Sequence, residues 1–311
     1  MAEEVAMREV YGKTLAELGR ENPDIVALDA DLSASTQTKF FAKEFPERFF
    51  DCGIAEANMV TIAAGLAKSG KIPFASTFAV FVPGRCFDQV RVSISQPRMN
   101  VKLVVTHGGL SVGEDGATHQ AIEDLALITS MPNFTVIVPG DGVETAQAVR
   151  TAAAFQGPVY IRLPRLKTPV FYGDDYKFEI GKASTLRDGK DVTIMAIGIM
   201  VAAAVEAAEN LAEEGIDCRV VNMSTLKPID EDIIKKAVTE TGAIVTAEEH
   251  YIHGGLAGAV AEVAALNTPV PMEFVGVRQY AESGAPAELL KKYGLTAADI
   301  EQAVKKVVKR K

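Results

Sequence analysis

The stretch DCGIAEANMVTIAAGLAKSGKIPFASTFAVF, from Asp51 to Phe81, decides the fold. It predicts a helix of small residues over 55–67 and then a short apolar strand that leads to Phe78 and, three positions later, Phe81. Glu56 stands at the start of the helix. A carboxylate beside two aromatic rings is an arrangement that can hydrogen-bond one edge of a flat heterocycle while the rings cover its faces. This is the first hypothesis about function.

The same alternation of strands and helices continues on both sides of this stretch. Short apolar runs are expected to form strands over 24–28, 72–76, 100–106, 135–138 and 159–162, with helical segments between them. Such alternation predicts a mostly parallel sheet with helices on both faces. Ligands of such sheets bind at the carboxyl ends of the strands. Glu56 and the loop that begins at His107 both follow expected strand ends.

The helical and strand periodicity stops between Pro164 and Lys177, where prolines, a glycine and an acidic pair favour a linker. A second, smaller α/β unit follows it. We therefore expect a first domain over residues 1–166, a linker over 167–182 and a second domain over 183–311. The predicted fold class is α/β, with two three-layer domains.

The composition is that of a globular protein, with 48% hydrophobic and 23% charged residues. The net charge of -9 argues against nonspecific binding to nucleic acid or to an anionic membrane. The start of the chain is unlike a signal peptide, and no apolar run approaches the roughly 20 residues that span a bilayer. The widely spaced cysteines indicate reduced thiols. We expect a cytoplasmic protein. The cysteines are Cys52, Cys86 and Cys218.

Several residue types could carry chemistry, and each also has a plain structural explanation. A glutamate in a first helical turn is favoured by the helix dipole, but the small apolar neighbours of Glu56 predict burial, which requires a partner. Phe78 and Phe81 are by themselves more typical of a core. Arg8, Arg162 and Arg165 are candidate anion ligands, although a lone arginine usually lies on the surface.

The loop HGGLSVGEDGATHQ, residues 107–120, is the strongest candidate for a ligand site. Its four glycines allow the backbone to approach a ligand closely. Its two histidines can transfer protons or bind hydroxyls and phosphates, and a turn-rich loop and a metal site are alternatives. His107 and His119 lack the helical spacing of common zinc sites. HYIHGGLAG, residues 250–258, is compatible with an anion site at a helix N-terminus or with a close-packed subunit contact.

Together these residues resemble the transketolase family of thiamine diphosphate enzymes, over essentially the whole chain. The most specific match is THGGLSVGEDGATHQAIEDLALITSMPN (106–133), followed at the right distance by GPVYIRLPR (157–165). The resemblance is to the C-terminal part of a full-length transketolase. It implies a pyrimidine-binding domain followed by the smaller transketolase C-terminal domain.

The resemblance also implies roles for individual residues. Glu56 would hydrogen-bond a pyrimidine nitrogen of the cofactor and favour the imino tautomer that activates the thiazolium carbon. Phe78 and Phe81 would pack against the pyrimidine, and Asp31 would also contact the cofactor. His107 and His119 would join Glu56 in catalysis. The residues implied for substrate binding are Arg8, Ser35, His107, Asp115, His119 and Arg165.

The resemblance further implies a missing half. A thiamine diphosphate enzyme of this kind carries a GDG sequence and a later asparagine that hold the metal and diphosphate, whereas EDG at 114–116 lies in the substrate loop. A partner chain, an N-terminal transketolase subunit, would supply this site with its Mg²⁺ or Ca²⁺. The pair would form a heterotetramer and transfer a two-carbon ketol unit between sugar phosphates in the pentose phosphate pathway.

Three other interpretations stay open from the sequence. The beta subunit of 2-oxoacid dehydrogenases has the same two-domain plan but does not usually carry GEDGATHQ. Deoxyxylulose-phosphate synthase has an arginine where this chain has Gly108. A catalytically silent scaffold or regulatory subunit is the non-enzyme alternative, and the retained Glu56, His107, Asp115 and His119 argue against it.

Overall fold

The computed structural model describes residues 3–173 and 175–311, and it confirms the predicted α/β class. The larger sheet has the strand order β12-β6-β7-β5-β4-β2-β3, with all neighbours parallel except β12. Its strands are β2 (Ile25–Asp29), β3 (Phe49–Asp51), β4 (Ile72–Ser76), β5 (Lys102–Val105), β6 (Thr135–Ile137), β7 (Val159–Arg162) and β12 (Thr225–Lys227).

Helices cover both faces of this sheet because its strands are apolar on both sides. Ile25 and Ala27 belong to the core beneath α1, α3 and α7, whereas Val26 and Leu28 belong to the core beneath α4 and α6. The helical segments of this part are α1 (Met7–Glu21), α2 (Ser33–Thr36), α3 (Lys39–Glu44), η1 (Pro46–Arg48), α4 (Glu56–Lys68), η2 (Gly84–Cys86), α5 (Phe87–Gln89), η3 (Val90–Ser95), η4 (Leu110–Asp115), α6 (Asp124–Thr129) and α7 (Gly142–Ala154).

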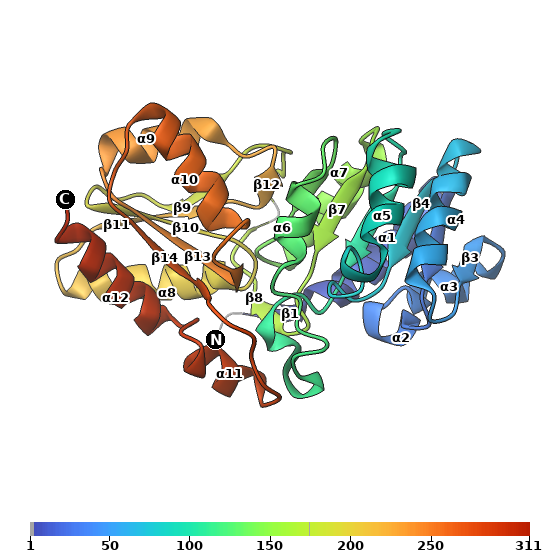
Figure 1. The fold of residues 1–311 in the computed structure, drawn as a ribbon, viewed down its shortest axis with the longest axis horizontal. Helices are drawn as coiled ribbons and strands as arrows, with labels where there is room; N and C mark the ends of the chain where they lie inside the picture. The colour runs from blue at the N-terminus through green and yellow to red at the C-terminus, as the bar shows by residue number, and fades with distance from the viewer. Residues whose placement is uncertain (1–2, 174) are drawn as a thin grey trace.

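The smaller sheet has the order β14-β13-β10-β11-β9 and is parallel except for β9. Helices α9 and α10 lie on one side of it, and α8 and α12 lie on the other (Figure 1). The strands are β9 (Ser184–Arg187), β10 (Val192–Ala196), β11 (Cys218–Asn222), β13 (Ile244–Tyr251) and β14 (Met272–Val277). The helices are α8 (Met200–Glu213), α9 (Glu231–Glu240), α10 (Leu256–Asn267), α11 (Pro286–Lys292) and α12 (Ala297–Val308).

Some elements differ from the predictions. The helical segment between β4 and β5 is a succession of 3₁₀, α and π turns over 84–95, and in the segment between β5 and β6 the helix α6 begins only at Asp124. The segment expected to be an irregular linker contains β8 (Lys167–Pro169), which pairs with β1 (Glu4–Ala6). Strands of three residues are too short to show a period of two, so periodicity could not reveal them.

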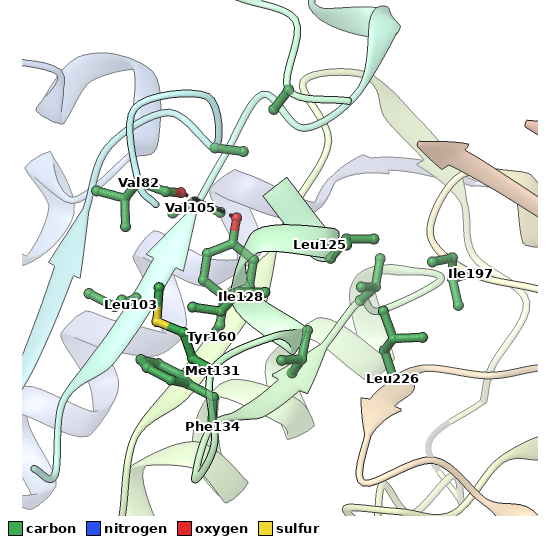
Figure 2. Packing of buried hydrophobic residues seen from close by; sticks show 14 of the residues in the cluster. Val82, Leu103, Val105, Leu125, Ile128, Met131, Phe134, Tyr160, Ile197 and Leu226 are labelled. Atoms are coloured by element: carbon green, nitrogen blue, oxygen red, sulfur yellow. Dashed lines mark hydrogen bonds between the residues drawn. The ribbon is translucent and has the colours of Figure 1, made fainter. Parts of the chain in front are cut away.

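The two sheets share one hydrophobic core. Figure 2 shows this core with Ile197 and Leu226 from the C-terminal half and Leu125 and Ile128 from α6, and all four are buried in the same cluster. Strand β12 also crosses from the C-terminal half to pair with β6 in the larger sheet. The halves of the chain are therefore joined by both hydrogen bonds and apolar packing.

Two further features concern the predictions about the cysteines and about membrane-spanning segments. The three cysteines are free thiols. Within residues 3–173 and 175–311, no helix combines the length and the apolar character that crossing a membrane requires.

Candidate active site

The candidate residues follow the carboxyl ends of neighbouring parallel strands, as the geometry of such sheets predicts. The segments after β7, β5, β4, β2 and β3 carry, in that order across the sheet, Arg165, His107, Phe78 with Phe81, Asp31 with Ser35, and Glu56. Asp115 and His119 lie further along the segment after β5, and Arg8 lies in the first turn of α1.

Glu56 is the first residue of α4 and is only 5% exposed. Its Oε1 accepts a hydrogen bond from Nη1 of Arg85 at 2.9 Å. The Arg85 guanidinium also lies over the Phe81 ring, with 3.8 Å between Cζ and the ring centroid. Among the described residues, no hydrogen-bond donor reaches the second oxygen, Oε2. The buried carboxylate thus keeps one acceptor available beside an aromatic surface.

Two phenylalanines and two histidines form a continuous aromatic group next to this carboxylate. The Phe78 and Phe81 rings are stacked, with centroids 5.7 Å apart and an angle of 18° between the ring planes. His107 stacks on Phe78 at 3.9 Å, and His119 meets the Phe81 ring edge-on at 5.5 Å. The structure therefore brings together the predicted aromatic pair and both histidines of the substrate loop.

His107 is a neutral imidazole in a positively charged setting. Burial lowers its pKa to about 3, with further contributions from Arg8, Arg165 and His119. Burial and the nearby Arg165 likewise lower the pKa of Arg8. The positive charges of these side chains repel one another, and an anion bound among them would reduce this repulsion. Three of the predicted phosphate ligands thus converge on one region.

Ser35 is held near Arg8 by its backbone. Nη1 of Arg8 donates to the carbonyl oxygen of Ser35 at 2.7 Å. The turn that contains Ser35 is built on buried Asp29, whose carboxylate accepts hydrogen bonds from the Leu32 N–H and from the hydroxyls of Thr36 and Thr38. Burial raises the pKa of Asp29 to about 6.

The two arginines near the end of β7 have different surroundings. Arg162 is buried and donates to Asp124 at 2.9 Å and to two backbone carbonyls, so its donors are committed within the protein. Arg165 is partly exposed and contacts the Val112 carbonyl and the Glu114 carboxylate, 3.0 Å away. Arg165 is therefore the more accessible of the two arginines.

Two predicted residues stand apart from this group. Asp115 is exposed at the end of η4, and its carboxylate makes no hydrogen bond with another described residue. Asp31 is also exposed and has a positive φ of 61°, and its N–H donates to the Asp51 carboxylate at 3.2 Å. No hydrogen bond or ion pair between described residues joins either aspartate to the aromatic group.

The anion-site interpretation of HYIHGGLAG is wrong. The N–H groups of Leu256 and Ala257, in the first turn of α10, donate to the buried carboxylate of Glu248 at 2.7 and 2.8 Å. His250 is completely buried, and burial lowers its pKa to about 4, so its 3.8 Å approach to Glu248 is not an ion pair. The helix N-terminus is filled by a side chain of the same domain.

Comparisons with known proteins agree with this architecture. Residues 3–170 match the family described as transketolase, pyrimidine binding domain, and residues 181–300 match transketolase, C-terminal domain. A putative transketolase C-terminal section of Methanocaldococcus jannaschii is 49% identical over 308 residues, which are 98% of this chain and 96% of that protein. Human transketolase is 40% identical over 313 residues, which are 99% of this chain but 50% of its own length.

A solved structure described as a split gene transketolase, inactive beta4 tetramer, is 54% identical. It aligns with a TM-score of 0.92 over 98% of this chain and 99% of that one. The chain belongs to the transketolase family. Within that family it corresponds to the C-terminal subunit of a split transketolase, because it matches such separate sections over their whole length and full-length transketolases over half of theirs.

Sequence reasoning missed Arg85 and Asp29. Arg85 follows Val82, Pro83 and Gly84, which signal a turn but not the direction of the next side chain. Asp29 stands at the end of an apolar strand, where a lone acid is a signal of a buried, hydrogen-bonded role. Neither contact could be located without the tertiary structure.

Proposed function

We propose that this chain is the C-terminal subunit of a two-component, thiamine-diphosphate-dependent transketolase that transfers a two-carbon ketol unit between ketose and aldose phosphates. The observation that carries the proposal is the position of Glu56: buried, at a helix start, with one free acceptor beside the stacked Phe78 and Phe81. The aminopyrimidine of thiamine diphosphate is flat and carries hydrogen-bond donors, which this surface suits.

Arg85 supports the fit of such a ring. Its guanidinium is itself a flat group with N–H donors, and it both pairs with Glu56 and stacks on Phe81. Arg85 therefore makes the two contacts that a bound pyrimidine would need, a hydrogen bond to Glu56 and stacking on Phe81. Glu56 would hold the ring nitrogen, and Phe78 and Phe81 would cover the ring. When bound, thiamine diphosphate supplies a nucleophilic carbon that breaks the bond next to a ketose carbonyl.

The cations support a phosphorylated substrate. Arg8 and Arg165 are close enough to His107 to lower its pKa, and neutral His107 retains a ring nitrogen for hydrogen bonding beside them. Arginine is suited to binding phosphate because its planar fork of N–H donors matches phosphate oxygens. In this proposal the three residues, with Ser35, bind the phosphate end of the sugar, and Asp115 and His119 contact its hydroxyls.

A partner chain completes the site in this proposal. The part of the chain that the structure describes contains no cluster of three or more His, Cys, Asp or Glu residues that could hold a metal ion. An N-terminal subunit would contribute the diphosphate site with its Mg²⁺ or Ca²⁺, and Asp31 would lie close to the cofactor where the chains meet. A heterotetramer in the cytoplasm is the expected assembly.

The test is reconstitution. The chain, a transketolase N-terminal subunit, thiamine diphosphate and Mg²⁺ are mixed, and transfer from xylulose 5-phosphate to an aldose phosphate is measured. Activity of the mixture, with neither chain active alone, is the expected result. Decarboxylation of a 2-oxoacid instead would favour the dehydrogenase-type alternative, and cofactor binding without turnover of either substrate would favour a silent subunit.

A further inference from the structure

The substrate loop, residues 107–120, is in contact with a buried acid of the C-terminal domain. Glu249 on β13 is 4% exposed, and its Oε1 accepts a hydrogen bond from the Ser111 N–H at 2.5 Å. The loop backbone approaches so closely that a Cβ atom on Gly109 would lie 2.1 Å from the Glu249 carboxyl carbon. Only glycine leaves room there, and the positive φ of 86° also favours glycine.

The start of the loop also lies against Arg162. A Cβ atom on Gly108 would lie 2.7 Å from Cζ of Arg162. The same guanidinium donates to the backbone carbonyl of Glu249 at 3.0 Å and to that of Ala121 at 2.9 Å. Directly after β5 the loop is therefore packed against a guanidinium from β7 and a carboxylate from the other domain.

The far end of the loop is held by the same domain. The Ser283 hydroxyl donates to the carbonyl of Glu114, and Nε2 of Gln120 donates to the carbonyl of Glu282 at 3.0 Å. Gly113 lies against Pro286, the first residue of α11. The contacts of Gly113 and Glu114 precede Asp115 in the sequence, and the contact of Gln120 follows His119. The C-terminal domain thus supports both ends of the segment that carries them.

Burying the carboxyl group of Glu249 in this position costs free energy. Burial raises the pKa of Glu249 to about 7, which means that the fold disfavours the ionised form. A buried carboxyl group costs stability unless it is hydrogen-bonded. The Glu249 side chain meets this requirement by accepting the Ser111 N–H, so the position of this loop residue depends on an acceptor at this place.

We infer that Glu249 is a positioning residue, through which the C-terminal domain sets the location of the substrate loop and so of His107, Asp115 and His119. The inference rests on the proposed function for the identity of the substrate. The contact between Glu249 and the loop does not depend on it. It gives the C-terminal domain a part in substrate binding without direct contact with the sugar.

Glu248 provides a matched control. It is adjacent on β13, fully buried, and its pKa is also raised to about 7 by burial. Its carboxylate, however, caps α10 by accepting the Leu256 and Ala257 N–H groups, and no hydrogen bond between described residues joins it to the loop. Substitutions at the two glutamates therefore carry similar burial and charge changes but remove different contacts.

The kinetic test uses the reconstituted two-chain enzyme. Glu249→Met keeps the size and removes the acceptor, and Glu249→Gln keeps an acceptor oxygen. Glu249→Met is expected to raise the KM for the ketose phosphate about tenfold or more, with the cofactor Kd within about twofold, and Glu249→Gln is expected to restore most of the loss. Glu248→Met should lower Tm but leave the donor KM within about twofold. An unchanged KM in Glu249→Met, or an equal change in Glu248→Met, would overturn the inference.

A second readout is independent of activity. Hydrogen–deuterium exchange of the isolated chain should become faster over residues 109–119 in Glu249→Met, whereas Glu248→Met should affect the start of α10. Glu249→Ala serves in both assays if the methionine variant does not fold. Unchanged loop exchange overturns the positioning role. Faster loop exchange in a protein that proves to lack transketolase activity would reject the proposed function and leave the loop contact standing.

Discussion

At the scale of single residues, the environment of each side chain decides its chemistry more than its type does. Glu56 and Glu249 are both buried glutamates, yet one faces an arginine and an aromatic surface and the other a backbone N–H. The four histidines differ in the same way. His107 and His250 are buried with strongly lowered pKa values, whereas His119 is half-buried and His253 is exposed.

Replacing Glu56 with glutamine tests the central assignment. The amide keeps the shape but cannot share a proton with a ring nitrogen, so we expect kcat of the two-chain enzyme to fall about 100-fold or more. Association with the partner, measured by size-exclusion chromatography, should be unchanged. Glu47→Gln, at an exposed carboxylate of the same domain, is the control. A fully active Glu56→Gln enzyme would remove the assignment.

Replacing His107 with alanine tests the phosphate site. The variant should raise KM for a phosphorylated donor more than for its unphosphorylated counterpart, because only the former meets Arg8 and Arg165. The measurement is the ratio of the two KM values. His253→Ala, in the loop after β13, should leave this ratio unchanged. Equal effects on both donors would show that His107 does not sense the phosphate.

His250 should make stability depend on pH. Burial lowers its pKa from the usual 6.5 to about 4, so between these values the unfolded chain binds a proton that the native chain does not. The contribution is complete above pH 6.5 and decreases as pH falls toward 4. The stability difference between wild type and His250→Asn should therefore shrink by about 2–3 kcal/mol over this interval in urea titrations. A constant difference would contradict a neutral buried imidazole.

At the scale of elements, the sequence predicted the long helices and the apolar strands because their periodicity extends over several turns or residues. The helix expected over 55–67 is α4. The segment 84–95 has apolar residues at helical spacing but closes as a π turn over 90–95. Spacing alone does not separate these helical forms.

Asp141 is an N-cap with a second function, and its removal should be costly. One oxygen caps α7 by accepting the Glu144 N–H, and the other accepts the N–H groups of Phe171 and Tyr172 in the connection between the domains. Asp141→Ala should lower the free energy of unfolding by about 3 kcal/mol or more, because three donors lose their acceptor.

A simpler cap gives the scale for that measurement. Thr296→Ala removes the side-chain cap of α12, which touches no other element through its hydroxyl, and should cost about 1 kcal/mol. Urea denaturation of the isolated chain measures both losses in the free energy of unfolding. Equal losses in the two variants would show that the hydrogen bonds to Phe171 and Tyr172 contribute nothing measurable.

At the scale of the whole molecule, the site could be predicted only in part. The GEDGATHQ motif and the strand ends indicated which residues gather, and Phe78, Phe81, His107 and His119 do lie together. The support of the loop by Glu249 was not predictable, because residues 111 and 249 approach only after both domains have folded. The boundaries at 166 and 183 remain predictions, since β12 and the shared core cross any such division.

The shared core predicts a single unfolding transition. Calorimetry of the isolated chain should show one cooperative peak, because Ile197 and Leu226 cannot leave the core without exposing Leu125 and Ile128. Leu226→Ala should shift the whole peak downward by several degrees. Leu266→Ala, at an exposed leucine of α10, is the control. Two separate transitions would show that the domains unfold independently.

The crossing of β12 has a consequence for recombination. A chimaera could join the first domain of one relative to the second domain of another at residues 166–183. Strand β12 would then come from one parent, whereas its neighbour β6 in the larger sheet would come from the other. Such an exchange would also replace the acid that meets Ser111. A working chimaera therefore needs more than a continuous first domain. Residues 225–227 and Glu249 have to come from the same parent as the first 166 residues, although they lie far from them in the sequence.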